Sequence, residues 1–276
     1  MCQCGPRYFG RVCDFILRHD FRPYRARAAQ VIPLVLVHGF MGGGAQWAGQ
    51  KAALSQDYEV IALDLPGFGE NAHLPVLDRI EGFADWAIAE LHRLNLPRYH
   101  LLGHSMGGMV VQEMLRRDAQ RIESLVLYST GSVGILPGRF ETISTSKARA
   151  AQEGAAATAR RISATWFLQR AAAEGYEPCA QIAEKSSLAA IQAGLTAMEA
   201  WTGAALLQEI DLRTLVLWGD QDRTYSWQQT HLLWSSISQA ELAVVPGCAH
   251  AVHLEKPDLF NSLLRDFLSN NAKRDA

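Results

Sequence analysis

The sequence lacks any long hydrophobic run, since no apolar stretch approaches the ~20 residues that a membrane-spanning helix requires. It also lacks a strong charge imbalance, because 26 Lys and Arg against 28 Asp and Glu leave a formal net charge of -2. A nearly neutral chain creates no long-range attraction for nucleic acid or anionic lipid. We therefore expect no membrane span and no nucleic-acid partner, and we leave a homodimer open.

Cysteine is scarce and unevenly placed. Cys2, Cys4 and Cys13 crowd the N-terminus, whereas Cys179 and Cys248 stand alone. An odd number at these spacings is not a disulfide framework, and no second ligand pair near Cys2 and Cys4 suggests a metal site, so we expect free thiols. The first 20 residues contain no apolar core typical of a signal peptide. These features predict a reducing, cytoplasmic compartment.

Residues 1–30 carry six arginines but only two acidic residues, Asp14 and Asp20. An arginine-rich, acid-poor start is typical of a transit peptide. The absence of serine and the two interrupting carboxylates argue against one. We favour a leading β-hairpin packed on the main sheet and keep the transit peptide as the alternative.

At 276 residues the chain is long enough for one large α/β domain. Short apolar, β-rich runs predict strands at Ile32–Val37, Tyr58–Leu63, Tyr99–Leu102, Ser124–Tyr128, Thr214–Trp218 and Glu241–Val245. Helical spacing between them predicts helices at Gln46–Leu54, Ile80–Leu94, Met106–Arg117, Ser226–Ser236 and Pro257–Leu268. This alternation predicts an α/β fold with a mostly parallel central sheet and helices on both faces.

The alternation breaks once, between Tyr128 and Thr214. Residues 132–209 are rich in alanine and contain no convincing strand, with helical patterns at Ser144–Arg161, Thr165–Glu174 and Ser187–Leu207. We interpret 132–209 as a helical cap inserted into a core made of residues 1–131 and 210–276.

The sharpest motif is Gly103–Gly108, which places a G-x-S-x-G pentapeptide between a predicted strand and a predicted helix. Ser105 on so tight a turn needs neighbours without bulk, and Gly103 and Gly107 supply them. The helix start also presents free N–H groups that favour a developing negative charge. The context predicts that Ser105 is a nucleophile.

A serine hydroxyl is a poor nucleophile without a histidine base and a carboxylate that orients it. The fifth predicted strand is followed by Asp220 and Asp222, and the sixth by His250. His253, three residues further on, is a rival base. The chain order of Ser105, an aspartate and His250 suits loops at the carboxyl edge of a parallel sheet.

Together these motifs resemble the α/β-hydrolase family, from about Val31 to Leu268. In that family the acid usually lies three residues past the glycine after this strand, here Gly219, so the resemblance selects Asp222 and leaves Asp220 as a turn former. Some members carry the acid one strand earlier, but residues 129–132 contain no carboxylate.

The segment Val37–Gly44 is similar to the family's oxyanion loop. The resemblance implies that the backbone N–H groups of Phe40 and Met106 hold the oxyanion. Leu63–Gly69 matches the next family turn, to which we assign a scaffolding role. His38 is expected to brace its loop rather than transfer a proton.

The remaining aromatic and histidine side chains are less specific. His104 adjoins the nucleophile but points elsewhere, so we expect it to pack or to brace a loop. Trp166, Phe167, Met198 and Trp201 in the cap either line a substrate pocket or pack the cap onto the core. The sequence favours neither reading of these four.

The resulting hypothesis is a cofactor-free, metal-free serine hydrolase that cleaves a small, fairly apolar ester or lactone through an acyl-enzyme on Ser105. A serine at this position disfavours the family's epoxide hydrolase and dehalogenase chemistries, which use a carboxylate. Alternatives are a C–C bond hydrolase or enol-lactonase of aromatic degradation, a cofactor-free lyase, or a receptor that retains the triad. The C–C hydrolases often have asparagine in place of His104, which weakens that match.

Overall fold

The computed structural model describes residues 31–136 and 141–269. The β-hairpin expected within residues 1–30, together with Cys2, Cys4 and Cys13, lies outside the described residues. Within the described part, no helix is long and apolar enough to cross a membrane. The cytoplasmic location and the homodimer stay predictions.

In the described part of the chain, six parallel strands form one sheet in the order β2-β1-β3-β4-β5-β6. They are β1 (Leu34–Val37), β2 (Val60–Leu63), β3 (Tyr99–His104), β4 (Ile122–Tyr128), β5 (Thr214–Gly219) and β6 (Ala240–Val245). Each overlaps a strand expected from the sequence, so the parallel α/β fold is confirmed. Because all six run the same way, their carboxyl ends meet at one edge of the sheet.

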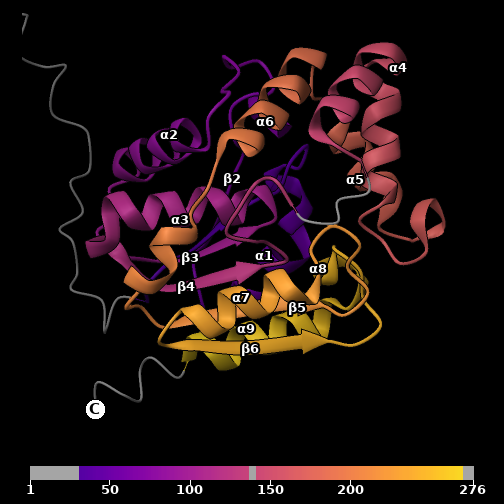
Figure 1. The fold of residues 1–276 in the computed structure, drawn as a ribbon. Coiled ribbons are helices and arrows are strands. Elements are labelled where there is room, and N and C mark those ends of the chain that lie inside the picture. The colour runs from indigo at the N-terminus through magenta and orange to yellow at the C-terminus, as the bar shows by residue number, and fades with distance from the viewer. Residues whose placement is uncertain (1–30, 137–140, 270–276) are drawn as a thin grey trace, which may run out of the picture. The chain divides into compact units, whose positions relative to one another are not determined.

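Helices cover both faces of this sheet (Figure 1). Side chains alternate between the faces along a strand, so Val35 and Val37 pack with one set of helices and Leu34 and Leu36 with the other. The first set is α2 (Ile80–Arg93), α3 (Met106–Asp118) and α7 (Trp227–Ser236); the second is α1 (Ala48–Leu54) and α9 (Pro257–Ser269). Short helices complete the core at Gly44–Trp47, Gly69–Asn71, Ala119–Arg121 and α8 (Val252–Glu255).

The chain between β4 and β5 contributes helices and no strand of the sheet, as far as it is described. Its elements are α4 (Ile143–Ala164), α5 (Tyr176–Ala183), α6 (Leu188–Ala200) and short helices at Arg170–Ala172 and Ala204–Glu209. Helix α4 packs against both α5 and α6, and Figure 1 shows the three grouped together. The division into a core and a cap at 132–209 stays a prediction.

The stretches near the two ends of this segment, around Val133 and around Thr202, lie side by side. Val133 and Thr202 form an isolated antiparallel bridge, and the N–H of Gly134 donates to the carbonyl of Trp201 at 3.0 Å. A Cβ on Gly134 would lie 1.5 Å from the carbonyl oxygen of Met198, so only glycine fits there. Backbone contacts between residues 133–134 and residues 201–202 therefore hold the two ends of the helical segment together.

Two helix predictions in this segment were wrong. Thr165–Glu174 forms turns with only a short helix at Arg170–Ala172, and the helix lies later, at α5. The carbonyls of Trp166, Phe167 and Leu168, which a continuous helix would bond internally, accept hydrogen bonds from other parts of the protein. The other prediction, Ser187–Leu207, is too long, because the backbone turns extended at Trp201 and ends α6.

Strand β3 buries a histidine far from the carboxyl edge. His100 is 4% exposed, and its Nδ1 lies 2.8 Å from the hydroxyl of Ser124. Burial lowers the pKa of His100 to about 4, and the charges of Arg98 and Arg213 act in the same direction. The folded protein therefore keeps this imidazole neutral.

We predict an acid-dependent loss of stability from His100. Between the ordinary pKa of 6.5 and the folded value of about 4, the unfolded chain binds the extra proton, so the free energy of unfolding falls as pH falls through this range and is constant above it. His100 itself should contribute roughly 1 kcal/mol per pH unit to this slope. Urea unfolding at pH 7.5 and pH 5 should show a smaller loss for His100→Asn than for the wild type, with the exposed His73→Asn as the matched control. Equal losses in all three proteins would contradict this account.

Candidate active site

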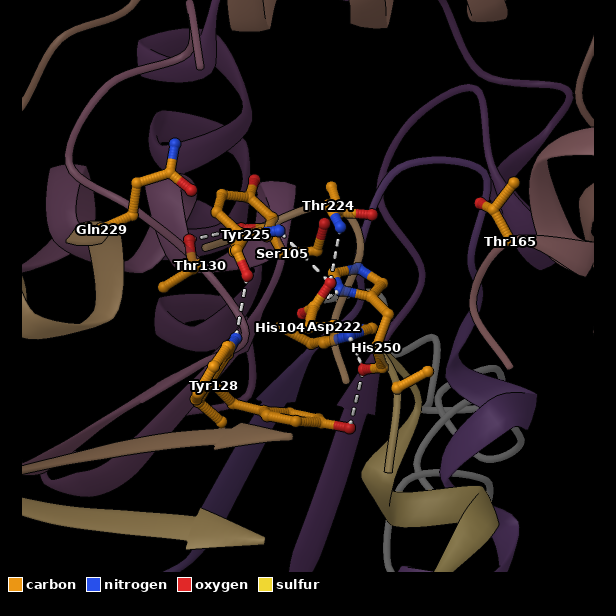
Figure 2. Close-up of polar contacts among 12 residues, drawn as sticks. His104, Ser105, Tyr128, Thr130, Thr165, Asp222, Thr224, Tyr225, Gln229 and His250 are labelled. Carbon is orange, nitrogen blue, oxygen red and sulfur yellow. Dashed lines mark hydrogen bonds and ion pairs between the residues drawn. The ribbon is translucent and has the colours of Figure 1, made fainter. Parts of the chain in front are cut away.

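Ser105 lies at the turn from β3 into α3 with φ 57° and ψ -121°. This left-handed conformation is strained for a residue with a side chain and persists only where the surroundings hold it. Its N–H donates to the carbonyl of Tyr128 at 3.0 Å, and its carbonyl accepts from the Thr130 hydroxyl at 2.7 Å and the Gly108 N–H at 2.9 Å. The end of β4 thus fixes the backbone of the nucleophile candidate (Figure 2).

Three glycines let backbones approach this turn closely. A Cβ on Gly103 would lie 2.3 Å from the carbonyl oxygen of Gly107, and one on Gly107 would lie 2.4 Å from that of Val37. A Cβ on Gly39 would lie 2.9 Å from the Cβ of Ser105. Of the glycines expected around Ser105, Gly103 is therefore required by contact with α3, and Gly107 by contact with β1.

His250 and Asp222 form a buried pair at the ends of β6 and β5. His250 Nδ1 lies 2.8 Å from Asp222 Oδ2, and both side chains are at most 3% exposed. The other carboxylate oxygen accepts the N–H groups of Thr224 at 2.7 Å and Tyr225 at 3.2 Å (Figure 2). A carboxylate fixed by three bonds places the proton of the neutral imidazole on Nδ1 and leaves Nε2 free to accept one.

The alternative acid has a different role in the geometry. Asp220 Oδ1 accepts the N–H of Gly247 at 2.7 Å, in the turn that follows β6. This bond joins the acid-bearing loop to the loop that leads to His250. Of the two aspartates, Asp222 is the one bonded to the histidine.

Ser105 and His250 line the same cavity. Within the described residues, the Ser105 hydroxyl makes no hydrogen bond to His250. Nucleophile–base contacts in hydrolases are often loose until substrate is bound. The arrangement leaves the hydroxyl open to the cavity with the base beside it.

Two buried groups hold the backbone of His250. The Nε2–H of His104 and the hydroxyl of Tyr128 both donate to its carbonyl oxygen, at 3.0 Å and 3.1 Å (Figure 2). The His104 ring stacks on Tyr128 with centroids 4.4 Å apart, and burial holds the pKa of His104 well below its usual range, with the charges of His250 and His253 adding to the effect. His104 is thus a neutral brace, and Tyr128 is a partner that no sequence motif marked.

His253 packs against both His104 and Tyr128. Its Nδ1 is 3.0 Å from the Tyr128 hydroxyl, its ring packs 4.3 Å from that of Trp47, and it is 2% exposed. Burial lowers the pKa of His253 to about 3, with the charge of His250 acting the same way. Because it is bonded to Tyr128 and not to an aspartate, its surroundings suit packing better than proton transfer.

The loop after β1 brings Phe40 to the cavity beside Ser105. His38 shapes this loop: its Nδ1–H donates to the carbonyl of Gly39 at 2.8 Å and its Nε2 accepts the Leu65 N–H at 2.9 Å. Burial lowers the pKa of His38, so it stays a neutral brace. Along the described chain no backbone acceptor receives the Phe40 N–H, and Met106, as the first residue of α3, has no intrahelical acceptor for its own.

Asp64, at the end of β2, organises the neighbouring turn. Its Oδ1 accepts the N–H groups of Gly44 at 2.9 Å and Glu70 at 3.1 Å. This carboxylate ties the β1 loop to the turn at Leu63–Gly69. The scaffolding role expected for that turn agrees with these contacts.

The cavity is mainly apolar, and its apolar lining includes Phe40, Met109, Leu136, Ile162, Trp166, Ile191, Leu195, Met198 and Leu254. Its lining residues include two arginines, Arg161 and Arg223, and no aspartate or glutamate. The Nε of Arg161 donates to Glu153 at 2.7 Å, so that charge is already paired. Across residues 31–136 and 141–269, no group of three or more His, Cys, Asp or Glu side chains is arranged to hold a metal ion.

The four aromatic and methionine candidates from the cap divide evenly. Trp166 and Met198 line the cavity. Phe167 and Trp201 do not, so a place in the substrate pocket is wrong for these two. The Trp201 Nε1–H donates instead to Glu113 on α3 at 2.9 Å, and Phe167 packs against Gly175. Trp201 thus ties the helical segment to α3, and Phe167 packs within the segment.

A strained serine at a strand-to-helix turn, with a histidine–aspartate pair on the ends of two later strands, is the arrangement that defines enzymes of the α/β-hydrolase class. The family model described as alpha/beta hydrolase fold matches residues 32–257. The chain belongs to this family.

Similar proteins include the dihydrolipoyllysine-residue acetyltransferase component of the acetoin cleaving system from Pseudomonas putida, which is 28% identical over 248 residues. That match covers 86% of this chain and 63% of the longer relative. The 2-hydroxy-6-oxo-6-phenylhexa-2,4-dienoate hydrolase from Burkholderia cepacia is 25% identical, covering 91% of this chain and 92% of that protein. A solved esterase from Thermogutta terrifontis superposes with a TM-score of 0.79 at 26% identity, covering 87% of this chain and 90% of its own.

The glycine contacts generate a prediction. Gly107→Ala places a methyl group against two backbone carbonyls, so we expect it to destabilise the fold by roughly 1–3 kcal/mol and to lower the activity of Ser105 by about 100-fold through displacement of the turn. Gly49→Ala, in α1 with nothing within 4 Å of the added Cβ, is the control and should stabilise slightly. Thermal unfolding and ester turnover of both variants test this. Wild-type activity in Gly107→Ala would show that the close approach is dispensable.

Proposed function

We propose that this enzyme is a serine hydrolase that cleaves a small, fairly apolar carboxylic ester or lactone through an acyl-enzyme on Ser105. The observation that carries the proposal is the buried Asp222–His250 pair at the same cavity as a serine with φ 57°. A hydroxyl next to an oriented imidazole is the arrangement needed for nucleophilic catalysis. Residues 132–209 serve in this proposal as the cap that closes the cavity.

In the first step, Ser105 Oγ attacks the substrate carbonyl carbon while His250 Nε2 takes the hydroxyl proton. The backbone N–H groups of Phe40 and Met106 stabilise the negative oxygen of the tetrahedral intermediate. The intermediate collapses, the C–O bond to the alcohol breaks, and the imidazolium returns its proton to the leaving oxygen. A water molecule then attacks the acyl-enzyme by the same route, which releases the acid and regenerates the serine.

Asp222 supports this cycle by stabilising the imidazolium that forms twice. The neutral states of His104 and His253 matter for the same reason, since a second positive charge beside His250 would oppose its protonation. The proposed base is thus the one histidine of this buried group that is paired with a carboxylate.

The lining supports an apolar acyl or alcohol group, and Arg223, whose guanidinium is bonded to backbone carbonyls and not to a carboxylate, disfavours a cationic one. A C–C bond hydrolase or an enol-lactonase is the alternative function, supported by the Burkholderia cepacia relative, whose name states a dienoate substrate. A lyase that binds a carboxylate through an arginine cluster is less well supported, because Arg161 is paired with Glu153.

The decisive experiment combines turnover of a short-chain nitrophenyl ester with labelling by a fluorophosphonate and location of the adduct by mass spectrometry. We expect turnover and a single adduct on Ser105. Asp222→Asn should lower kcat by roughly 10³–10⁴-fold, because the imidazole loses its orienting charge. Asp220→Asn, two residues away, should retain most of the activity. A folded wild-type protein with neither turnover nor adduct would overturn the proposal.

The charge of the lining gives a further prediction. Butyrylcholine and 3,3-dimethylbutyl butyrate have nearly the same shape, but only the first carries a positive charge. We expect kcat/KM for the neutral ester to be at least about 10-fold higher, since a loss of 1.4 kcal/mol in binding the cation is a tenfold effect. A pH-stat assay of acid release compares the two directly. Equal values would show that the charge of Arg223 does not influence the bound alcohol group.

A further inference from the structure

Glu255, the last residue of α8, joins two segments that the sequence places far apart. Its Oε2 accepts the N–H of Ala249, next to His250, at 2.6 Å. Its Oε1 accepts the N–H of Leu168, between α4 and α5, at 2.6 Å. Charge-assisted bonds from a carboxylate to backbone amides are among the stronger hydrogen bonds in proteins.

Leu168, whose N–H donates this second bond, belongs to residues 166–168. This short segment contacts both the loop that carries His250 and the loop that carries Asp222. On the histidine side, the N–H of Ala251 donates to the carbonyl of Trp166 at 2.9 Å. On the aspartate side, the Arg223 guanidinium donates to the carbonyls of Phe167 at 3.2 Å and Leu168 at 3.3 Å. Every carbonyl of residues 166–168 is thus bonded to a residue adjacent to His250 or to Asp222.

We propose that Glu255 is a positioning residue for the hydrolytic reaction, acting through residues 166–168 to hold the loops of His250 and Asp222 in register. This inference rests on the function proposed above. The 2.8 Å bond between His250 and Asp222 joins two separate loops, so its geometry depends on their relative position. Misplacement of a catalytic group by about 1 Å can lower a rate by 100-fold.

Trp166 gives this arrangement a second consequence. Its carbonyl is bonded to the histidine loop, and its side chain lines the cavity. The wall of the substrate cavity and the base are therefore held by the same three residues. A substrate that displaces Trp166 also disturbs the placement of His250.

The test compares Glu255→Gln with Asp258→Asn, a control three residues along that removes an exposed carboxylate from the first turn of α9. In the glutamine an NH₂ group replaces one acceptor oxygen. This donor then faces a backbone N–H, so one of the two hydrogen bonds is lost. We expect kcat on the nitrophenyl ester and the rate of fluorophosphonate labelling to fall about 10- to 100-fold, with KM changed less than threefold. The control should match the wild type in all three measurements.

A second variant removes the bonds between residues 166–168 and the loop that carries Asp222. Arg223→Gln should also lower kcat, and the double variant with Glu255→Gln should lose less than the product of the two single effects, because both act through residues 166–168. A purely structural role for Glu255 would lower the unfolding temperature and leave kcat of the folded enzyme unchanged.

The outcomes separate this inference from the proposed function. If the wild type turns over the ester and the kcat of folded Glu255→Gln lies within threefold of the wild-type kcat, the positioning role is overturned and the hydrolase proposal stands. Absence of turnover and of a Ser105 adduct in the wild type removes both. If Glu255→Gln does not fold, Arg223→Gln decides, and a kcat within threefold of the wild type then overturns the inference.

Discussion

The close approach of three backbones around Ser105 is the constraint on which the rest of the site depends. The loop after β1 touches the serine at Gly39, and the first turn of α3 touches β1 at Gly107. Contacts this short leave no room for side chains, and they set where the serine hydroxyl and the neighbouring N–H groups lie. The parallel sheet supplies the rigid edge that makes such precision available from loops.

The second requirement is electrostatic. In the proposed mechanism His250 becomes an imidazolium during turnover, yet its side chain is buried, and burial by itself favours the neutral form. The carboxylate of Asp222 offsets that cost, while His104 and His253 contribute no charge because their own burial keeps them neutral. Three buried histidines can share this region because only one of them is paired with an acid.

The sequence was sufficient for the features that local patterns encode. The strands and the tight turn at Ser105 follow from apolar runs and glycine spacing, whereas the choice of Asp222 over Asp220 as the partner of His250 came from the resemblance to the family. The region around Thr165–Glu174 could not be predicted, since its backbone carbonyls bond to distant loops and not within a helix. Tyr128 was missed for a related reason: it ends a buried strand like any other apolar residue, and only tertiary contact gives its hydroxyl a partner.

In the proposed enzyme, substrate selection and catalysis both depend on residues 166–168. A cap that only covered the cavity could vary freely with the substrate, without consequence for the chemistry. Here the backbone of residues 166–168, within the proposed cap, accepts hydrogen bonds from Ala251 and Arg223, which adjoin His250 and Asp222. Changes in this part of the lining therefore act on the base as well as on the bound ligand. Ile191 and Leu195, on α6, line the cavity with aliphatic side chains that form no hydrogen bonds, so replacing them leaves the bonds of residues 166–168 in place and should change substrate preference at less cost to turnover.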